Sequence, residues 1–90
     1  MKLTWDETKR QKTLSERQLD FNDCAKVFAG KSYNFPDERK DYGKARNITV
    51  GFLRGRMVII VWTSHRDTRH IISMRKTNER EITKYEGRLG

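Results

Sequence analysis

Arginine and histidine side chains bracket a short apolar segment near the end of the chain, in the run Arg69-His70-Ile71-Ile72-Ser73-Met74-Arg75. Cations held at fixed positions on a strand suit a phosphate backbone. The same residue types also suit metal-free RNA cleavage, in which the 2′-hydroxyl of the RNA attacks the adjacent phosphate. That reaction needs a base, cations on the phosphorane and an acid at the leaving 5′-oxygen, so positioning and electrostatics carry most of it.

Three residues of this segment are candidate catalytic groups: Arg69, His70 and Arg75. Because a histidine side chain ordinarily titrates near neutral pH, His70 can act as base or acid. On a regular strand the two arginines point to one face and His70 points to the other, so only a bulge would bring all three together. Structural explanations stand beside the catalytic ones: Arg69 as a solvent-facing strand residue and His70 as a partly buried side chain.

Further cations and one helix lie close to this segment in sequence. His65 and Arg66 occupy the preceding turn and can reach over the same surface, and Arg46 opens a neighbouring strand. Glu81 and Tyr85 are one helical turn apart, so they share a helix face. Their structural explanations are a helix cap for Glu81 and a seal between helix and sheet for Tyr85.

Other kinds of chemistry are poorly supported by the sequence. One cysteine and two histidines without a ligand spacing do not predict a zinc site, and no other metal or cofactor is expected. There is no glycine-rich phosphate loop. Ser73 would be a nucleophile only with a base beside it, and the Asp37-Glu38 pair falls in a predicted loop, which suggests solvated surface.

The charge of the chain is strongly positive and unevenly distributed. Its 90 residues carry a net charge of +8, with ten cations and eight anions in residues 1–45 and ten cations and four anions in residues 46–90. This favours a polyanionic partner, either nucleic acid or an acidic protein. The single Cys24 excludes an internal disulfide and fits a reducing cytosol. We expect no signal peptide, no membrane span and one domain over residues 1–90.

The first half of the sequence predicts two helices. The first spans 6–18 with Asp6 as its cap, and the second spans 21–29 and ends at Gly30. One apolar face of the second helix is formed by Phe21, Cys24, Ala25 and Phe28. Residues 31–44 contain a proline, a glycine and many charges, which predicts a loop or a short edge strand.

The second half changes to a period of two, which indicates strands. We predict strands at 46–52, 56–63 and 69–76, joined by turns at 54–55 and 64–68. The middle strand is apolar throughout and should be central. A C-terminal helix should begin at Asn78, with Glu81 completing a capping box. The class is therefore α+β, with an antiparallel meander.

The order of several short segments carries a family resemblance. They are Trp5-Asp6-Glu7 with Lys9, Leu19-Asp20-Phe21 with Ala25 and Val27-Phe28, Arg46-Asn47-Ile48-Thr49-Val50-Gly51, the apolar 58–61 strand, Ile71-Ile72-Ser73-Met74-Arg75-Lys76, and Glu79-Arg80-Glu81 with Tyr85-Glu86. Together they span nearly the whole chain. In this order they resemble the BrnT family, the ribonuclease toxins of a bacterial type II toxin–antitoxin system.

This resemblance implies a RelE-like fold, with two N-terminal helices packed on an antiparallel sheet of about four strands and a C-terminal helix. It implies a cytoplasmic endoribonuclease without a metal cofactor. It also implies an antitoxin partner, BrnA, whose ribbon-helix-helix part binds DNA, and which neutralises the toxin and represses the operon with it. With RNA as substrate, catalysis is assigned to Arg69, His70 and Arg75, and RNA binding to Arg46, His65, Arg66, Lys76, Arg80 and Tyr85.

The chain departs from the family pattern at three places. It has Glu16-Arg17-Gln18 where the family usually has Lys-His-Gly, Ala45 where an acidic residue usually precedes the strand arginine, and Thr77 where alanine usually follows Arg-Lys. The alternative prediction is a non-catalytic basic module that kept the fold and binds nucleic acid or an acidic protein.

Overall fold

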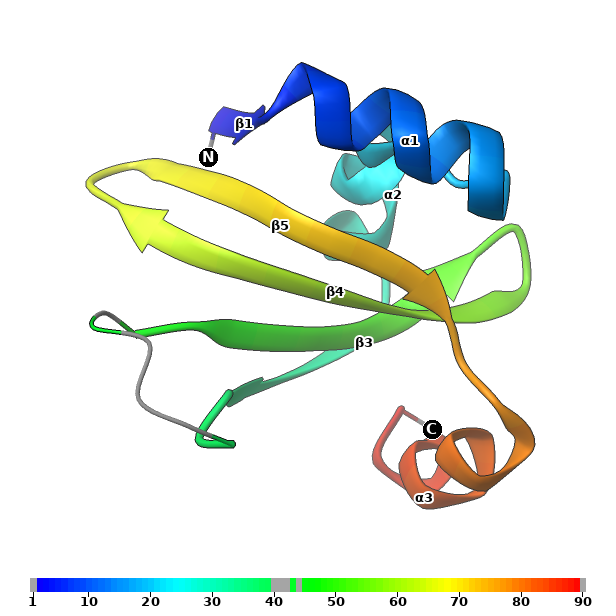
Figure 1. The fold of residues 1–90 in the computed structure, drawn as a ribbon. Helices are drawn as coiled ribbons and strands as arrows, with labels where there is room; N and C mark the ends of the chain where they lie inside the picture. Colours follow the sequence, from blue (N-terminus) through cyan, green and yellow to red (C-terminus); the bar gives the residue numbers. More distant parts are fainter. Residues whose placement is uncertain (1, 40–42, 44, 90) are drawn as a thin grey trace.

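The computed structural model describes residues 2–39, 43 and 45–89, which form an α+β fold around a five-stranded mixed sheet (Figure 1). The sheet order is β1-β5-β4-β3-β2. In chain order the elements are β1 (Lys2–Trp5), α1 (Glu7–Arg17), the 3₁₀ helix η1 (Phe21–Asp23), α2 (Cys24–Ala29), β2 (Ser32–Pro36), β3 (Asn47–Leu53), β4 (Arg56–His65), β5 (Thr68–Lys76) and α3 (Glu79–Leu89).

The sheet separates two apolar clusters. Figure 1 shows α1 and α2 on one side of the sheet, here called the α1 face, and α3 on the other, the α3 face. The α1 face buries Leu19, Phe21, Cys24, Val27, Leu53, Val58, Ile60, Trp62, Ile71 and Met74. The α3 face buries Ile48, Val50, Met57, Ile59, Val61, Tyr85 and Leu89. Strand β4 contributes to both clusters, which confirms the prediction that this apolar strand is central.

The turn between β3 and β4 has the backbone conformation that a tight hairpin requires. Arg54 and Gly55 have φ angles of 50° and 79°, both in the left-handed region. Two consecutive positive φ values match the right-handed twist of the flanking strands. The predicted hairpin at 54–55 is therefore confirmed.

A bulge in β5 changes which face its side chains reach. Val61 pairs with Ser73 whereas the next residue, Trp62, pairs with Ile71, so Ile72 is an extra residue on β5. As a result Ile71 and Met74 both pack on the α1 face although they are three residues apart. The alternation expected for a regular strand is therefore interrupted in the middle of the candidate segment.

Strand β1 was not predicted, and it makes the sheet mixed. It pairs in parallel with β5, from Lys2 opposite Thr68 to Trp5 opposite Ile71. The prediction of a wholly antiparallel sheet of about four strands is therefore wrong in this detail, whereas the α+β class, the two N-terminal helices and the C-terminal helix are confirmed. The two strands lie at opposite ends of the sequence, so local patterns could not reveal their pairing.

The helix α1 is held by polar contacts rather than by an apolar stripe. Asp6 caps it as predicted, accepting hydrogen bonds from the backbone N–H groups of Thr8 and Lys9. No residue of α1 is buried. Arg10 instead forms a bidentate pair with Asp20, with N–O distances of 2.7 and 3.0 Å. The pKa of the Asp20 carboxyl is lowered chiefly by this hydrogen bonding.

The predicted helix over 21–29 is divided into η1 and α2. The 3₁₀ turn shifts the buried face, so Val27 is buried beside Phe21 and Cys24 while Ala25 is exposed, contrary to the predicted face. Burial raises the pKa of the Cys24 thiol to about 12, so it is not a nucleophile near neutral pH. Of the predicted loop or edge strand at 31–44, the part at Ser32–Pro36 is strand β2, and residues 40–42 and 44 lie outside the described residues.

Candidate functional site

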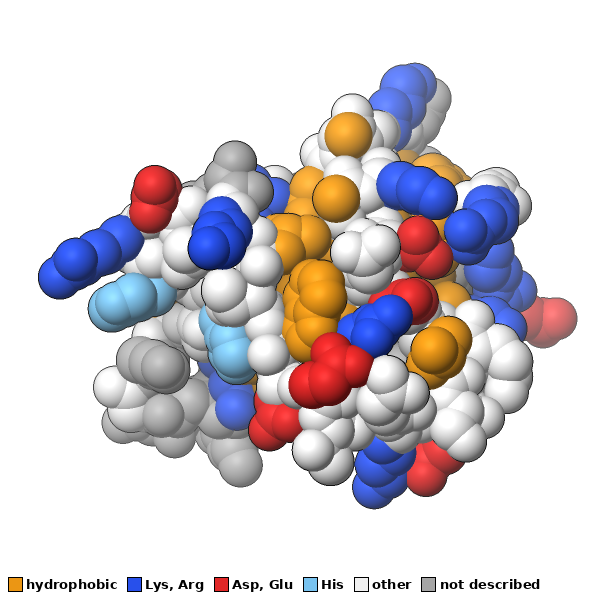
Figure 2. Space-filling view, turned by 90° about the horizontal axis from the view of Figure 1, so that it is seen from above, with side chains coloured by type: hydrophobic (Ala, Val, Ile, Leu, Met, Phe, Trp, Pro, Cys, Tyr) orange, Lys and Arg blue, Asp and Glu red, His pale blue; other side chains and the backbone are white. Residues whose placement is uncertain are grey.

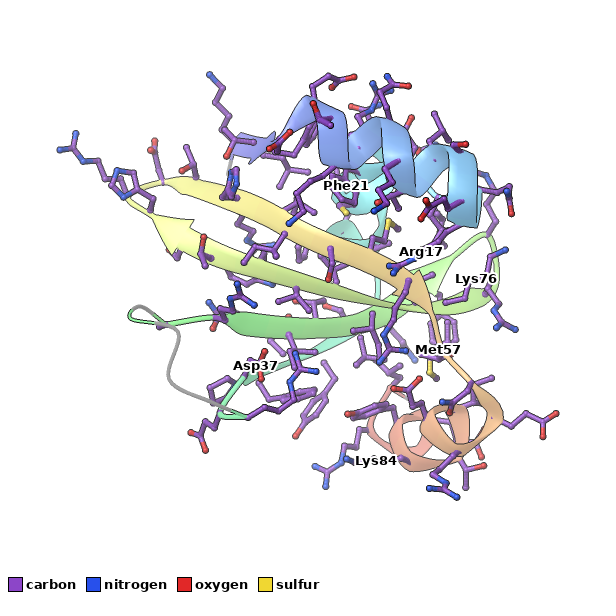
Figure 3. The ribbon with its side chains drawn as sticks, viewed as in Figure 1. Arg17, Phe21, Asp37, Met57, Lys76 and Lys84 are labelled. Carbon is purple, nitrogen blue, oxygen red and sulfur yellow. The ribbon has the colours of Figure 1, made fainter. Side chains whose placement is uncertain are left out.

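A pocket of about 330 Å³ opens on the α3 face and is here called the α3 pocket. Its apolar residues include Ile48, Ile59 and Val61 from the middle of the sheet. Its polar and charged residues are Asp37, Glu38, Arg39, Ser73, Arg75, Glu81, Lys84 and Tyr85. In Figure 3, Asp37 and Lys84 both lie on the side of the sheet opposite Phe21. The pocket therefore combines an apolar base with a charged rim.

One side of the α3 pocket is a bidentate pair between β5 and α3. Arg75 donates to Glu81 through both terminal nitrogens, at 2.8 and 2.7 Å. These hydrogen bonds lower the pKa of Glu81 from 4.5 to about 2 and raise the pKa of Arg75. Glu81 also accepts from the backbone N–H of Asn78, whose side chain accepts from the Glu81 N–H, so the predicted capping box is confirmed.

A second arginine of the α3 pocket follows β2. Arg39 donates to both oxygens of Asp37, at 2.8 and 2.7 Å, and the Asp37 side chain is fully buried. Asp37 is therefore not the solvated surface residue that the sequence suggested. The charge of Arg39 acts to lower the pKa of Arg75, so the two guanidinium groups are electrostatically coupled in the same pocket. Lys84 adds a third cationic side chain to the lining.

Arg69 lies on the opposite face of the sheet from Arg75. Its guanidinium carbon is 4.2 Å from the centre of the Phe28 ring and 4.8 Å from the centre of Trp62, both on the α1 side. Such stacking is typical of an arginine that covers an aromatic cluster. The bulge at Ile72 therefore separates the two arginines that a regular strand would place together.

His70 lies on the same side of β5 as Arg75 but far along the strand. It directly precedes Ile71, which faces α1, so its side chain points to the α3 side. Its Nδ1 is hydrogen-bonded with the Thr4 hydroxyl at 2.9 Å. Five strand residues span roughly 16 Å, so His70 is distant from the Arg75 guanidinium, which turns toward α3. The structure does not gather Arg69, His70 and Arg75 at one point.

The predicted RNA-binding residues are distributed over several surfaces. Arg46 lines a hollow beside α1, and Lys76 lines another that also includes Arg75. His65 and Arg66 are exposed where β4 turns into β5, and Figure 2 shows both histidine side chains toward the hairpin end of the molecule. On α3, Arg80 is exposed, whereas Tyr85 is 8% exposed and stacks on Phe35 with ring centres 5.7 Å apart.

Sequence reasoning missed two cations of the α3 pocket, Arg39 and Lys84. Arg39 falls in a charged segment without periodicity, so nothing in the pattern distinguished it from solvated surface. Lys84 directly precedes Tyr85 and follows Glu81 by three residues, and that helix spacing was an available signal.

Within residues 2–39, 43 and 45–89, no group of three or more His, Cys, Asp or Glu side chains could hold a metal ion. No helix in the same residues is long and apolar enough to cross a membrane.

Comparison with known proteins agrees with the resemblance seen in the sequence. The family described as the ribonuclease toxin BrnT of a type II toxin–antitoxin system matches residues 5–81, which include Arg75 and Glu81 of the α3 pocket. No curated protein matches the chain at a significant level. The match covers strands β2 to β5 but only the last residue of β1, and it extends into α3. The chain therefore belongs to the BrnT family of type II toxin–antitoxin ribonuclease toxins.

Proposed function

We propose that this toxin is a metal-independent endoribonuclease whose phosphate-binding centre is the α3 pocket. The observation that carries the proposal is the presence of Arg75, Arg39 and Lys84 in one pocket over an apolar base. Cations in a partly water-excluded site stabilise a charged phosphorane more strongly than they would in bulk water. A guanidinium has five N–H donors, so Arg75 can hold Glu81 and still contact a phosphate.

In the proposed mechanism the pocket orients the scissile phosphate and neutralises its developing charge. Arg75 contacts the non-bridging oxygens, with its guanidinium plane fixed by Glu81. Glu81 is a weak base because its pKa is about 2. We assign the base role to the Glu38 carboxylate, which accepts the 2′-hydroxyl proton, and the acid role to the Lys84 ammonium, which protonates the leaving 5′-oxygen.

Neither Arg69 nor His70 keeps its predicted catalytic role in this proposal. Arg69 packs on Phe28 and Trp62, so we propose that it stabilises the fold. His70 remains a candidate for contact with an RNA strand that continues along the α3 face from the pocket. His65 and Arg66 at the hairpin tip belong to the same extension.

We infer a RelE-like fold acting as one cytoplasmic toxin domain. Two helices on one face of the sheet and one on the other support that inference. The proposed partner is a BrnA-like antitoxin with a ribbon-helix-helix DNA-binding part. Covering the α3 pocket would be the simplest way for it to neutralise the enzyme, because a substrate phosphate could then not reach Arg75.

A non-catalytic binding module is the second candidate function. It is favoured by the ion pairs that Arg75 and Arg39 already form with carboxylates in the pocket. A binder would retain RNA or acidic-protein affinity without cutting. RNA binding alone therefore does not separate the two candidates, whereas the appearance of cleaved RNA does.

The deciding experiment is cleavage of a defined RNA in excess EDTA, with an Arg75→Ala preparation purified in parallel. The proposal predicts cleavage with wild-type protein, products ending in 2′,3′-cyclic phosphate, and no cleavage where the scissile nucleotide is 2′-deoxy. Induced expression should also arrest growth, and co-expression of the antitoxin should relieve the arrest. Activity that requires added magnesium, or equal cleavage by the two preparations, would contradict the proposal.

A further inference from the structure

The helix α1 leaves a polar hollow where a helix packed on a sheet usually buries apolar side chains. None of its residues is buried. The hollow has a volume of about 530 Å³ and is here called the α1 groove. It is lined by Lys9, Lys12, Thr13, Glu16, Arg17, Arg46, Ile72 and Ser73. Among the described residues, four cationic side chains and one carboxylate therefore line this groove.

The spacing of the α1 residues shows that the groove follows the helix. Lys9, Lys12, Thr13, Glu16 and Arg17 recur at intervals of three and four residues, so they form one continuous helix face. From Lys9 to Arg17 the helix rises by roughly 12 Å. Cations are thus arranged along a line, as an extended polyanion would need.

The strand next to this helix face has an unpaired edge. Strand β1 pairs with β5 only as far as Ile71. Beyond it, Arg17 donates to the carbonyl oxygen of Met74 at 3.0 Å, and in Figure 3 Arg17 lies at the end of β5 where Lys76 also lies. Arg17 therefore fixes α1 beside the edge and leaves Ile72 and Ser73 accessible in the groove between them.

The α1 groove is continuous with the α3 pocket around this edge. Ser73 lines both. A third hollow of about 400 Å³ includes Arg17 of the groove and Arg75 of the pocket, together with Lys76. One chain of phosphates could therefore pass from the pocket over Ser73 and along α1, with cationic side chains beside most of its path and the carboxylate of Glu16 beside one part.

We infer that the α1 groove binds the sugar–phosphate backbone of single-stranded RNA on one side of the scissile bond. This inference rests on the proposed function, because the α3 pocket gives the strand its starting point. Lys9 and Lys12 are both exposed and contact phosphates, while Arg17 and Arg46 complete the cationic lining of the groove. The contacts are to the backbone, so they contribute affinity without reading sequence.

An RNA strand fits these observations better than an acidic protein does. The groove is predominantly cationic and is continuous with a phosphate pocket, whereas a stable protein interface is usually centred on apolar or aromatic residues. Among the residues that the structure describes, Ile72 is the only one with a hydrophobic side chain in the lining of the groove.

The test compares two double variants with the same loss of charge. One is Lys9→Gln with Lys12→Gln, and the control is Lys2→Gln with Lys31→Gln, which removes two exposed lysines outside the groove. Binding of a fluorescent 2′-O-methyl decanucleotide, which cannot be cleaved, is measured by anisotropy over a range of salt. Cleavage of a dinucleotide, which fills the α3 pocket alone, is measured separately.

The groove variant should bind the decanucleotide about tenfold more weakly than the control at low salt. Its salt slope should fall by about 1.4, because each lost phosphate contact on a single strand contributes about 0.7. Dinucleotide cleavage should change by less than about twofold. Equal RNA affinity in the groove variant and the control would overturn the inference. A groove variant that keeps its RNA affinity and loses only antitoxin binding would also overturn it. Failure of every preparation to cleave would contradict the proposed function and leave the binding comparison valid.

Discussion

Arg69 and Arg75 are two arginines of the same strand with opposite surroundings. Arg69 stacks on the Phe28 and Trp62 rings on the α1 face. Arg75 is held by Glu81 at the rim of a pocket on the α3 face. One guanidinium thus covers an apolar cluster, and the other presents charge where a ligand can reach it. Both residues are arginines of β5, so their different surroundings follow from the face of the sheet to which each side chain points.

The face is decided by one extra residue. With Ile72 as a bulge, Ile71 and Met74 can both pack on the α1 face, and Arg75 turns to α3. If Ile72 were instead paired as part of a regular strand, alternation would place Arg69 and Arg75 on the same side and would put Ile71 and Met74 on opposite sides. The bulge therefore completes a core and aims a functional side chain at the same time.

Replacing Ile71 by aspartate should break this arrangement and have the largest effect. The bulge places Ile71, which is 1% exposed, in the core of the α1 face, where a carboxylate would be buried without a partner. We expect loss of cooperative unfolding, measured by circular dichroism and urea titration. Ile72→Asp is the control, because the neighbouring bulge residue is only partly buried, and this variant should remain folded. Equal losses of stability in the two variants would show that the bulge does not separate the faces of these two residues.

Replacing Arg75 by alanine should have the next largest effect, on catalysis. Removal of one charged donor aimed at a transition-state oxygen costs about 10²–10³ in rate. Arg75→Lys should recover little, because lysine lacks the bidentate geometry. The control is Glu81→Gln, which breaks the same ion pair but leaves the arginine, and it should lose less than about tenfold. Equal losses in Arg75→Ala and Glu81→Gln would assign Arg75 a structural role alone.

The elements were largely predictable from sequence, whereas the α3 pocket was only partly predictable. The hairpin at Arg54-Gly55 and the box of Asn78 and Glu81 are encoded within a few residues, and both are confirmed. The pocket depends on longer-range arrangements. Arg39 reaches it from a segment after β2, and the capping residue Glu81 also becomes the partner of Arg75. Neither relation is visible until the sheet brings the segments together.

The bulge illustrates why alternation alone failed for β5. A period of two predicts faces correctly only while the register is unbroken. A signal of the extra residue was present in the sequence. Ile71 and Ile72 are adjacent apolar residues, and Met74 follows Ile71 by three positions, whereas residues on one face of a regular strand are an even number apart. Adjacent apolar residues also occur in β4, which is buried on both faces, so the pattern does not separate the two cases.

Replacing Arg69 by alanine should affect stability more than catalysis. Loss of stacking on two rings and of the packed side-chain stem should lower the free energy of unfolding by about 1–2 kcal/mol. Arg69→Met keeps much of the packing and should lose about half as much. RNA cleavage should change by less than about threefold, measured well below the unfolding transition. A tenfold loss of cleavage with unchanged stability would restore a catalytic role for Arg69.

The ion pair of Arg75 gives the smallest effect, on the pH dependence of stability. The pKa of Glu81 is about 2 in the folded protein against 4.5 ordinarily, so between these values the unfolded chain binds more protons. The stabilisation is therefore complete above about pH 4.5 and is lost as pH falls toward 2. The Arg75 side chain is 42% exposed, so solvent screening reduces the contribution to about 1 kcal/mol. Glu81→Gln keeps a capping side chain without the charge. At pH 6 the free energy of unfolding of the wild type, measured by urea titration, should exceed that of this variant by about 1 kcal/mol. This difference should vanish near pH 2. A difference that stays constant over this range would show that the cap, and not the charge on Arg75, stabilises this edge of the α3 pocket.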